Sequence, residues 1–129
     1  MSVTTSMISL SAIKRRLEQY LEKQGFFLRF PIPPSDADII NLLTVTLGHE
    51  PSKYDFASLE WETNIDGMKV YITYMRGDVN VYFHIWVDDF TSYHYVSKFN
   101  EEKRCFLPPE PTYLPIARIK EGRVDAESV

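Results

Sequence analysis

Two short turn sequences in the middle of the chain constrain the fold more than any other feature. Asp66-Gly67 and Gly77-Asp78 each place a glycine where a two-residue β-hairpin turn requires a positive φ. Apolar and polar residues alternate on both sides of each turn, which is typical of strands that bury one face. The region from about residue 56 to 99 is therefore predicted to form an antiparallel meander.

Taken as two-residue turns, these sequences also predict how three strands pair. The first turn pairs Ile65 with Met68, and the second pairs Arg76 with Val79. Both turns place the same residues of the shared strand on one face, namely Met68, Val70, Ile72 and Tyr74. Because a slip of one residue would move every side chain to the opposite face, this agreement supports the register.

A fourth strand is expected after the Asp88-Asp89 loop, but the sequence leaves its facing open. A two-residue loop would place Tyr93 and Tyr95 on the outer face, whereas a three-residue loop would place them in the core. With the three-residue loop, His94 shares the face of His84 and is offset from it along the strand.

Two helices are expected before the meander, over residues 9–24 and 36–47. The first has apolar residues at helical spacing with charged residues opposite. The second is interpreted as a buried helix that follows the capping residue Ser35, with a strand as the lesser alternative because of its β-branched residues. The apolar run from Phe26 to Phe30, which prolines follow, is expected to form a brief or edge strand. The predicted fold class is therefore α+β: a two-layer domain with an antiparallel meander of three to five strands packed against one or two N-terminal helices.

The length of 129 residues predicts one domain, which we place at residues 9–116. Residues 1–8 are expected to be a flexible N-terminus, and residues 117–129 a polar tail. The proline-rich residues 107–116 are expected to form an extended strap over the domain, although such a stretch can also be a ligand for a proline-recognising groove. Residues spaced to anchor the strap are Phe106, Tyr113, Leu114 and Ile116.

Charge and cysteine content limit the classes of partner. With 14 basic and 18 acidic residues the chain carries a net charge of −4, which is the wrong sign for a protein that binds nucleic acid. The sequence contains neither an apolar run of membrane-spanning length nor a basic and apolar leader, so we expect no membrane partner. Cys105 has no second cysteine to pair with, in agreement with an expected cytoplasmic location.

Patterns that usually carry catalysis are missing from the sequence. His49, His84 and His94 have no metal-ligand spacing, and the 5 glycines are too scattered to form a phosphate-binding loop. Cys105 follows Arg104, but no local histidine pattern accompanies it. We therefore expect no catalytic residue, metal or cofactor, and an enzyme is disfavoured.

The outer face of the meander is unusually aromatic for a solvated surface. Tyrosine and tryptophan are typical of interface cores, because they bury a large area and keep a polar atom available. This face is either a docking surface or is covered by the first helix or the proline strap. The candidate partner-binding residues are Glu62, Lys69, Tyr71, Tyr82, His84, Trp86 and Asp88.

Two function classes follow from these observations. The first is a non-enzymatic, small acidic protein-binding module, of the adaptor, inhibitor, immunity or chaperone type, that docks a partner protein or a second copy (a homodimer) through this face. The alternative is a small-molecule-binding protein or enzyme with an aromatic-lined pocket between sheet and helix. Its polar contacts would be Tyr82, His84 and Asp88.

Overall fold

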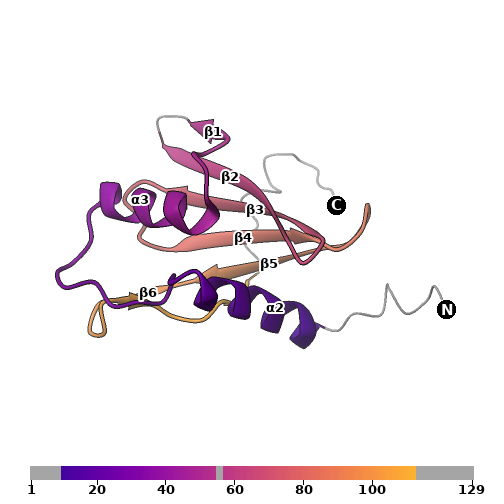
Figure 1. The fold of residues 1–129 in the computed structure, drawn as a ribbon, viewed down its shortest axis with the longest axis horizontal. Coiled ribbons are helices and arrows are strands. Elements are labelled where there is room, and N and C mark those ends of the chain that lie inside the picture. Colours follow the sequence, from indigo (N-terminus) through magenta and orange to yellow (C-terminus); the bar gives the residue numbers. More distant parts are fainter. Residues whose placement is uncertain (1–9, 55–56, 113–129) are drawn as a thin grey trace.

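The computed structural model describes residues 10–54 and 57–112 (Figure 1). Two helices, α2 (Leu10–Lys23) and α3 (Asp36–Leu47), precede all of the strands. The strands are β1 (Lys53–Tyr54), β2 (Ser58–Ile65), β3 (Met68–Met75), β4 (Val81–Trp86), β5 (Ser92–Ser97), β6 (Phe99–Asn100), β7 (Cys105–Phe106) and β8 (Glu110–Pro111). The segments predicted to be a flexible N-terminus and a polar tail, and the predicted anchors Tyr113, Leu114 and Ile116, lie outside the described residues.

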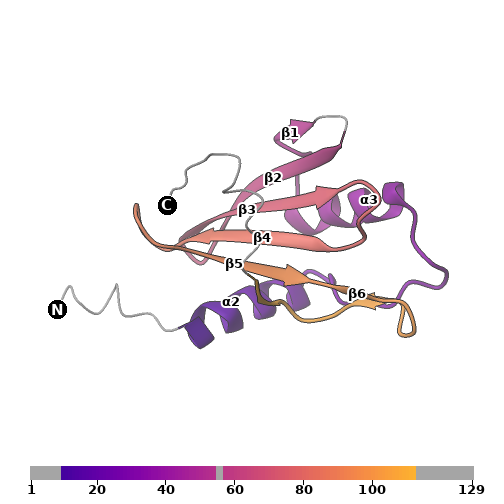
Figure 2. The ribbon, with the colours of Figure 1, turned by 180° about the vertical axis from the view of Figure 1, so that it is seen from behind.

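The strands form an antiparallel sheet in the order β1-β2-β3-β4-β5-β8, beside a small β6-β7 hairpin. Both helices lie on the same side of the sheet, in front of it in Figure 1 and behind it in Figure 2. The molecule is thus an α+β, two-layer structure in which N-terminal helices pack on an antiparallel meander, and the predicted fold class is confirmed.

The predicted register of the three central strands is confirmed, although one of the two turns differs. Asp66 (φ 51°) and Gly67 (φ 83°) form the expected two-residue turn between Ile65 and Met68. The β3–β4 ladder runs from Lys69–Trp86 to Tyr74–Val81, so the predicted pair Arg76–Val79 is not part of it.

The second tight turn is formed one residue earlier than predicted. The amide of Asp78 donates to the carbonyl of Met75 at 2.9 Å, so Arg76 and Gly77 are the central residues of the turn. Gly77 has a φ of 87°. A positive φ at the second central position is the requirement of a type II turn, which glycine meets without strain.

The loop before β5 contains three residues, Asp88 to Phe90, because the amide of Val87 donates to the carbonyl of Thr91 at 3.0 Å. This loop turns Tyr95 into the core, where its side chain is 1% exposed, and Tyr93 packs partly against the same core. His94 consequently lies on the outer face.

The core lies between the two layers. Helix α2 contributes Ile13, Leu17 and Leu21, all fully buried, and α3 contributes Ile39 and Leu43. The alternate residues of the strands complete the core, with the largest contributions from Trp61, Tyr74, Phe83 and Tyr95.

Helix α3 has the predicted bounds, and its buried residues are Ile39, Leu43, Thr46 and Leu47. Ser35 and Asp38 form a capping box at its start, and Gly48 ends it in the left-handed conformation with a φ of 81°. Val45, on the side away from the sheet, is 66% exposed.

The predicted strand over Phe26–Phe30 is wrong, because these residues form a turn and an irregular segment after α2. The run is apolar because its rings pack together: Phe26 is fully buried and stacks on Phe106 with ring centroids 4.7 Å apart. The amide of Phe30 donates to the carbonyl of Arg104 at 2.8 Å, which joins this segment to the β6–β7 hairpin.

The described part of the proline-rich segment lies at the edge of the sheet. Pro111 is opposite Tyr95 and Glu110 is opposite Val96. Proline is tolerated there because it has no amide hydrogen to pair on the outside of an edge strand. After β8 the amide of Thr112 donates to the carbonyl of His94 at 3.0 Å.

Candidate partner-binding face

The outer face is the side of the sheet that points away from α2 and α3 (Figure 2). Seven residues were predicted for this site, and six of them lie in strands. The alternation of buried and exposed positions places these six on the outer face. Glu62 comes from β2, Lys69 and Tyr71 from β3, and Tyr82, His84 and Trp86 from β4. The seventh, Asp88, lies in the loop at the end of β4.

Aromatic side chains from three neighbouring strands meet at the centre of this face. The ring centroid of His84 is 4.1 Å from that of His94, 5.1 Å from that of Trp86 and 6.4 Å from that of Tyr71. We call these four residues the ring cluster. All four are partly exposed, so their rings offer contact area to another molecule.

His94 and Ser92 lie at this site but were not among its predicted residues. His94 is directly opposite His84 in the β4–β5 ladder, not offset from it as the three-residue loop had been expected to place it. Ser92 lies opposite Trp86, and its Oγ is hydrogen-bonded to His84 Nε2 at 3.0 Å. The residue count of the preceding loop is the signal that would have identified both.

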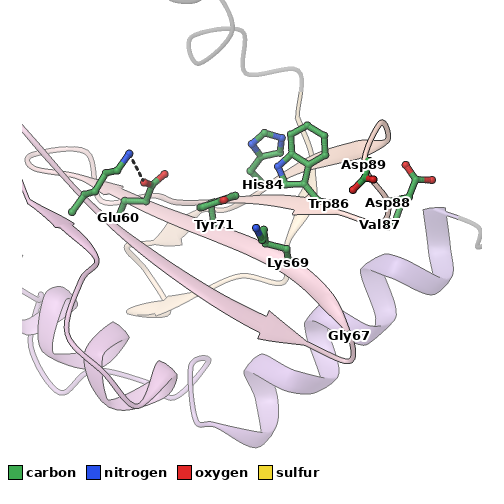
Figure 3. Close-up of a pocket in the computed structure, with 10 residues that line it drawn as sticks. Glu60, Gly67, Lys69, Tyr71, His84, Trp86, Val87, Asp88 and Asp89 are labelled. Atoms are coloured by element: carbon green, nitrogen blue, oxygen red, sulfur yellow. Dashed lines mark ion pairs between the residues drawn. The ribbon is translucent and has the colours of Figure 1, made fainter.

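Two hollows lie on the outer face. The larger, of about 710 Å³, is lined by Lys69, Tyr71, His84, Trp86 and Asp88 together with Lys53, Glu60, Gly67, Val87 and Asp89. Figure 3 shows His84 and Trp86 standing side by side on the sheet surface, with Asp88 and Asp89 beyond them.

The smaller hollow, of about 140 Å³, has a more apolar lining. Among its lining residues are Tyr71, Met75, Tyr82, His84 and His94. Its remaining lining residues are Glu60, Thr73, Phe83, Tyr95 and Thr112. Tyr71 and His84 are shared by both hollows, so the ring cluster stands between them.

Charged side chains surround the aromatic centre in opposite-sign pairs. Lys53 Nζ is 3.8 Å from Glu60 Oε1, and Lys69 Nζ is 3.8 Å from Glu62 Oε2. The two lysine side chains are 80% and 56% exposed, respectively. Exposed pairs of this kind contribute at most about 1 kcal/mol, so a partner can replace either interaction at little cost.

Asp88 lines the larger hollow, but its carboxylate is occupied by its own loop. Oδ1 accepts hydrogen bonds from the amides of Phe90 and Thr91, both at 2.8 Å. The Phe90 amide, followed by the Thr91 side chain and amide, lowers the pKa of Asp88 despite some opposing desolvation. Asp88 therefore stabilises the three-residue loop and adds negative charge to the rim.

Tyr82 combines an apolar ring with a fixed hydroxyl. Its OH donates to Asp78 Oδ2 at 3.1 Å. Burial, and then the charge and hydrogen bond of Asp78, raise the pKa of Tyr82. The phenol is therefore neutral at physiological pH, and its hydroxyl is held by Asp78 beside the smaller hollow.

Within residues 10–54 and 57–112, no three His, Cys, Asp or Glu side chains are grouped so as to hold a metal ion. Tyr82, His84 and Asp88 were the predicted polar contacts of a pocket between sheet and helix. They lie instead on or beside the opposite face of the sheet, and core side chains fill the space between the layers.

In the described part of the chain, neither helix has the length and apolar character needed to cross a membrane.

Comparison with known proteins gives no relative from which a function could be carried over. No protein-family model, no curated protein and no solved structure matches this chain.

Proposed function

We propose that this protein is a non-enzymatic binding module that docks a partner protein through its outer face. The observation that carries the proposal is the ring cluster: four partly exposed rings from three strands, gathered on the face that the helices leave free. Tyrosine and tryptophan are enriched among the residues that dominate binding energy, because they bury a large area at a low entropic cost.

The shape of the face favours a protein partner over a small ligand. The larger hollow, of about 710 Å³, has the volume of a small-molecule site, but it is open to solvent and five of its ten lining residues are charged, whereas such sites are enclosed and mostly apolar. The smaller hollow, at about 140 Å³, is below the roughly 300 Å³ at which small-molecule sites begin. It is large enough to take one apolar side chain of a partner, as an anchor residue does.

The partner can be another protein or a second copy of this chain. Lys53, Lys69, Glu60 and Glu62 form a rim of both signs, and such a rim can meet its own copy across a two-fold axis. Self-association is therefore the first binding mode to measure, and an unrelated protein is the second.

The test compares two double variants on opposite sides of the molecule. Tyr71→Ala with Trp86→Ala removes two rings of the cluster, whereas Ile32→Ala with Val45→Ala removes side chains that are each 66% exposed on the helix side. Circular dichroism checks that both variants fold. Light scattering over a range of concentrations then measures self-association, and capture from an extract of the native host measures binding to other proteins.

The proposal requires that one of these associations is seen with the wild type and with the Ile32/Val45 variant and is lost with the Tyr71/Trp86 variant. Binding that persists in a folded Tyr71/Trp86 variant would contradict it. A wild type that stays monomeric and captures nothing would contradict it as well.

A further inference from the structure

The described chain ends beside the ring cluster. Thr112 follows β8, donates its amide to the carbonyl of His94 and lines the smaller hollow together with Tyr71, Tyr82 and His84. Residues 113–129 therefore start at the rim of the outer face, next to the side chains that we propose for partner binding.

The length of this segment matches the width of the face. Four strand spacings separate β8 from β2, which is about 19 Å at roughly 4.8 Å each. Six extended residues, 113 to 118, span about 20 Å at roughly 3.3 Å each. A chain that crosses the face from Thr112 consequently brings Arg118 to β2.

The chemistry of the segment matches the surface along this path. Tyr113, Leu114, Pro115 and Ile116 would cross β5 and β4, where the rings lie. Proline-containing extended segments bind aromatic surfaces with a small loss of conformational entropy. Residues 113–120 include Arg118 and Lys120 and no acidic residue, and they would meet Glu60 and Glu62 on β2.

We propose that residues 113–120 dock across the outer face of their own sheet as an intramolecular ligand, which a partner must displace. Three observations support the docking: the position of Thr112, the length of the segment relative to the width of the face, and the match between its side chains and those of the outer face. The displacement by a partner rests on the proposed function.

Paramagnetic relaxation tests the docking without any partner. A nitroxide is attached at Ala117→Cys in a Cys105→Ser background, which leaves one thiol because the chain has 1 cysteine. We expect the label to remove NMR signals of Tyr71, His84 and Trp86, and to leave those of Val45, on the far side of α3, intact. Equal signal loss at both sites, or none at either, would overturn the docking.

Two further samples make the result specific. Arg118→Glu should restore the signals of the outer face, whereas Arg123→Glu, a matched charge reversal beyond residue 120, should not. A mixed sample distinguishes an intramolecular from an intermolecular contact. It combines protein that carries the nitroxide but no NMR isotope with isotope-labelled protein that carries no nitroxide. Signal loss in the mixed sample equal to that within one chain would overturn the intramolecular assignment.

A second test keeps Cys105, so it can be made even if the Cys105→Ser protein does not fold. The chain has 2 tryptophans, of which Trp86 lies on the outer face and Trp61 is fully buried. Arg118→Glu should shift the indole N–H signal of Trp86 and not that of Trp61, and Arg123→Glu should shift neither. An unshifted Trp86 signal in Arg118→Glu would overturn the docking.

The two proposals fail in different ways. Where both hold, Arg118→Glu increases the association measured above, because the competing segment is weakened. If residues 113–120 dock but no partner is found, the docking stands, and the proposed function is overturned together with the displacement. A partner that binds wild type and Arg118→Glu equally overturns the competition.

Discussion

His84 organises the outer face because it contacts side chains on both neighbouring strands. Its ring stacks on His94, lies against Trp86 and Tyr71, and is hydrogen-bonded to Ser92. Single residues also connect the layers: the hydroxyl of Tyr74, in the core of the sheet, donates to the carboxylate of Asp36 at the start of α3. Asp36 also accepts from the amide of Gly77, in the turn after β3, at 3.4 Å.

Tyr74→Phe is expected to destabilise the protein by about 1–3 kcal/mol, the cost of removing a hydrogen bond to a charged group. Urea unfolding measures the change. Tyr71→Phe is the matched control, because its hydroxyl is on the partly exposed outer face and removing it should change stability by less than about 0.5 kcal/mol. Equal effects of the two substitutions would contradict the role assigned to the Tyr74–Asp36 contact.

Stability is also expected to fall at alkaline pH. Burial raises the pKa of Tyr20, Tyr74, Tyr82 and Tyr95 above the ordinary value of 10.0, so the folded state holds these protons more tightly than the unfolded state. Their contribution is complete below about pH 10 and is lost as pH rises above it. Urea unfolding between pH 8 and 11 should show this decline, with a smaller slope in Tyr74→Phe; a flat profile would contradict it.

At the scale of elements, the meander is the part of the fold that the sequence predicts best. Register depends on which residues share a face, and alternating apolar residues determine this even where the turn is placed wrongly. The β3–β4 connection is an example: its tight turn lies at Arg76–Gly77, yet Tyr74 still pairs with Val81.

Two elements could not be predicted, for different physical reasons. The length of the loop before β5 depends on the Asp88 carboxylate binding two amides of its own loop, which periodicity cannot reveal. The directly opposed His84–His94 pair, in contrast, follows from the three-residue alternative by counting back from the Val87–Thr91 closure, so the predicted offset of His94 was an error of register. The Phe26–Phe30 run was mistaken for a strand because a short apolar run looks the same whether it pairs in a sheet or packs its rings in a loop.

Adjacent residues of β3 give a test of the register. Val70 is fully buried and Lys69 is exposed on the outer face. Val70→Asp should abolish cooperative thermal unfolding, because it buries a charge without a partner. Lys69→Asp should cost no more than about 1 kcal/mol, since it changes only exposed charges. A stable, cooperatively folded Val70→Asp protein would show the register to be wrong.

At the scale of the whole molecule, a phenylalanine cluster joins the segment after α2 to the β6–β7 hairpin. Phe106 stacks on Phe26 and has its ring centroid 5.2 Å from that of Phe99 and 6.4 Å from that of Phe30. The hairpin immediately precedes β8, so this cluster helps to position the strand from which the chain reaches the outer face.

Phe106→Ala is expected to cost about 3–5 kcal/mol, the usual effect of removing a buried phenylalanine ring. Chemical denaturation measures the loss. Phe90→Ala is the matched control, because Phe90 is 93% exposed and its loss should leave stability within about 0.5 kcal/mol of the wild type. A Phe106→Ala protein as stable as the control would show that the hairpin is not joined to the core through this ring.

The two edges of the sheet have a consequence for how this protein behaves in a crowded solution. β1 and β8 contain two residues each, and β8 carries a proline. Short and proline-containing edges give a foreign strand few backbone groups to pair with, which is how β proteins resist aggregation. The backbone at both margins of the sheet therefore discourages growth into fibrils, whatever occupies the aromatic face between them.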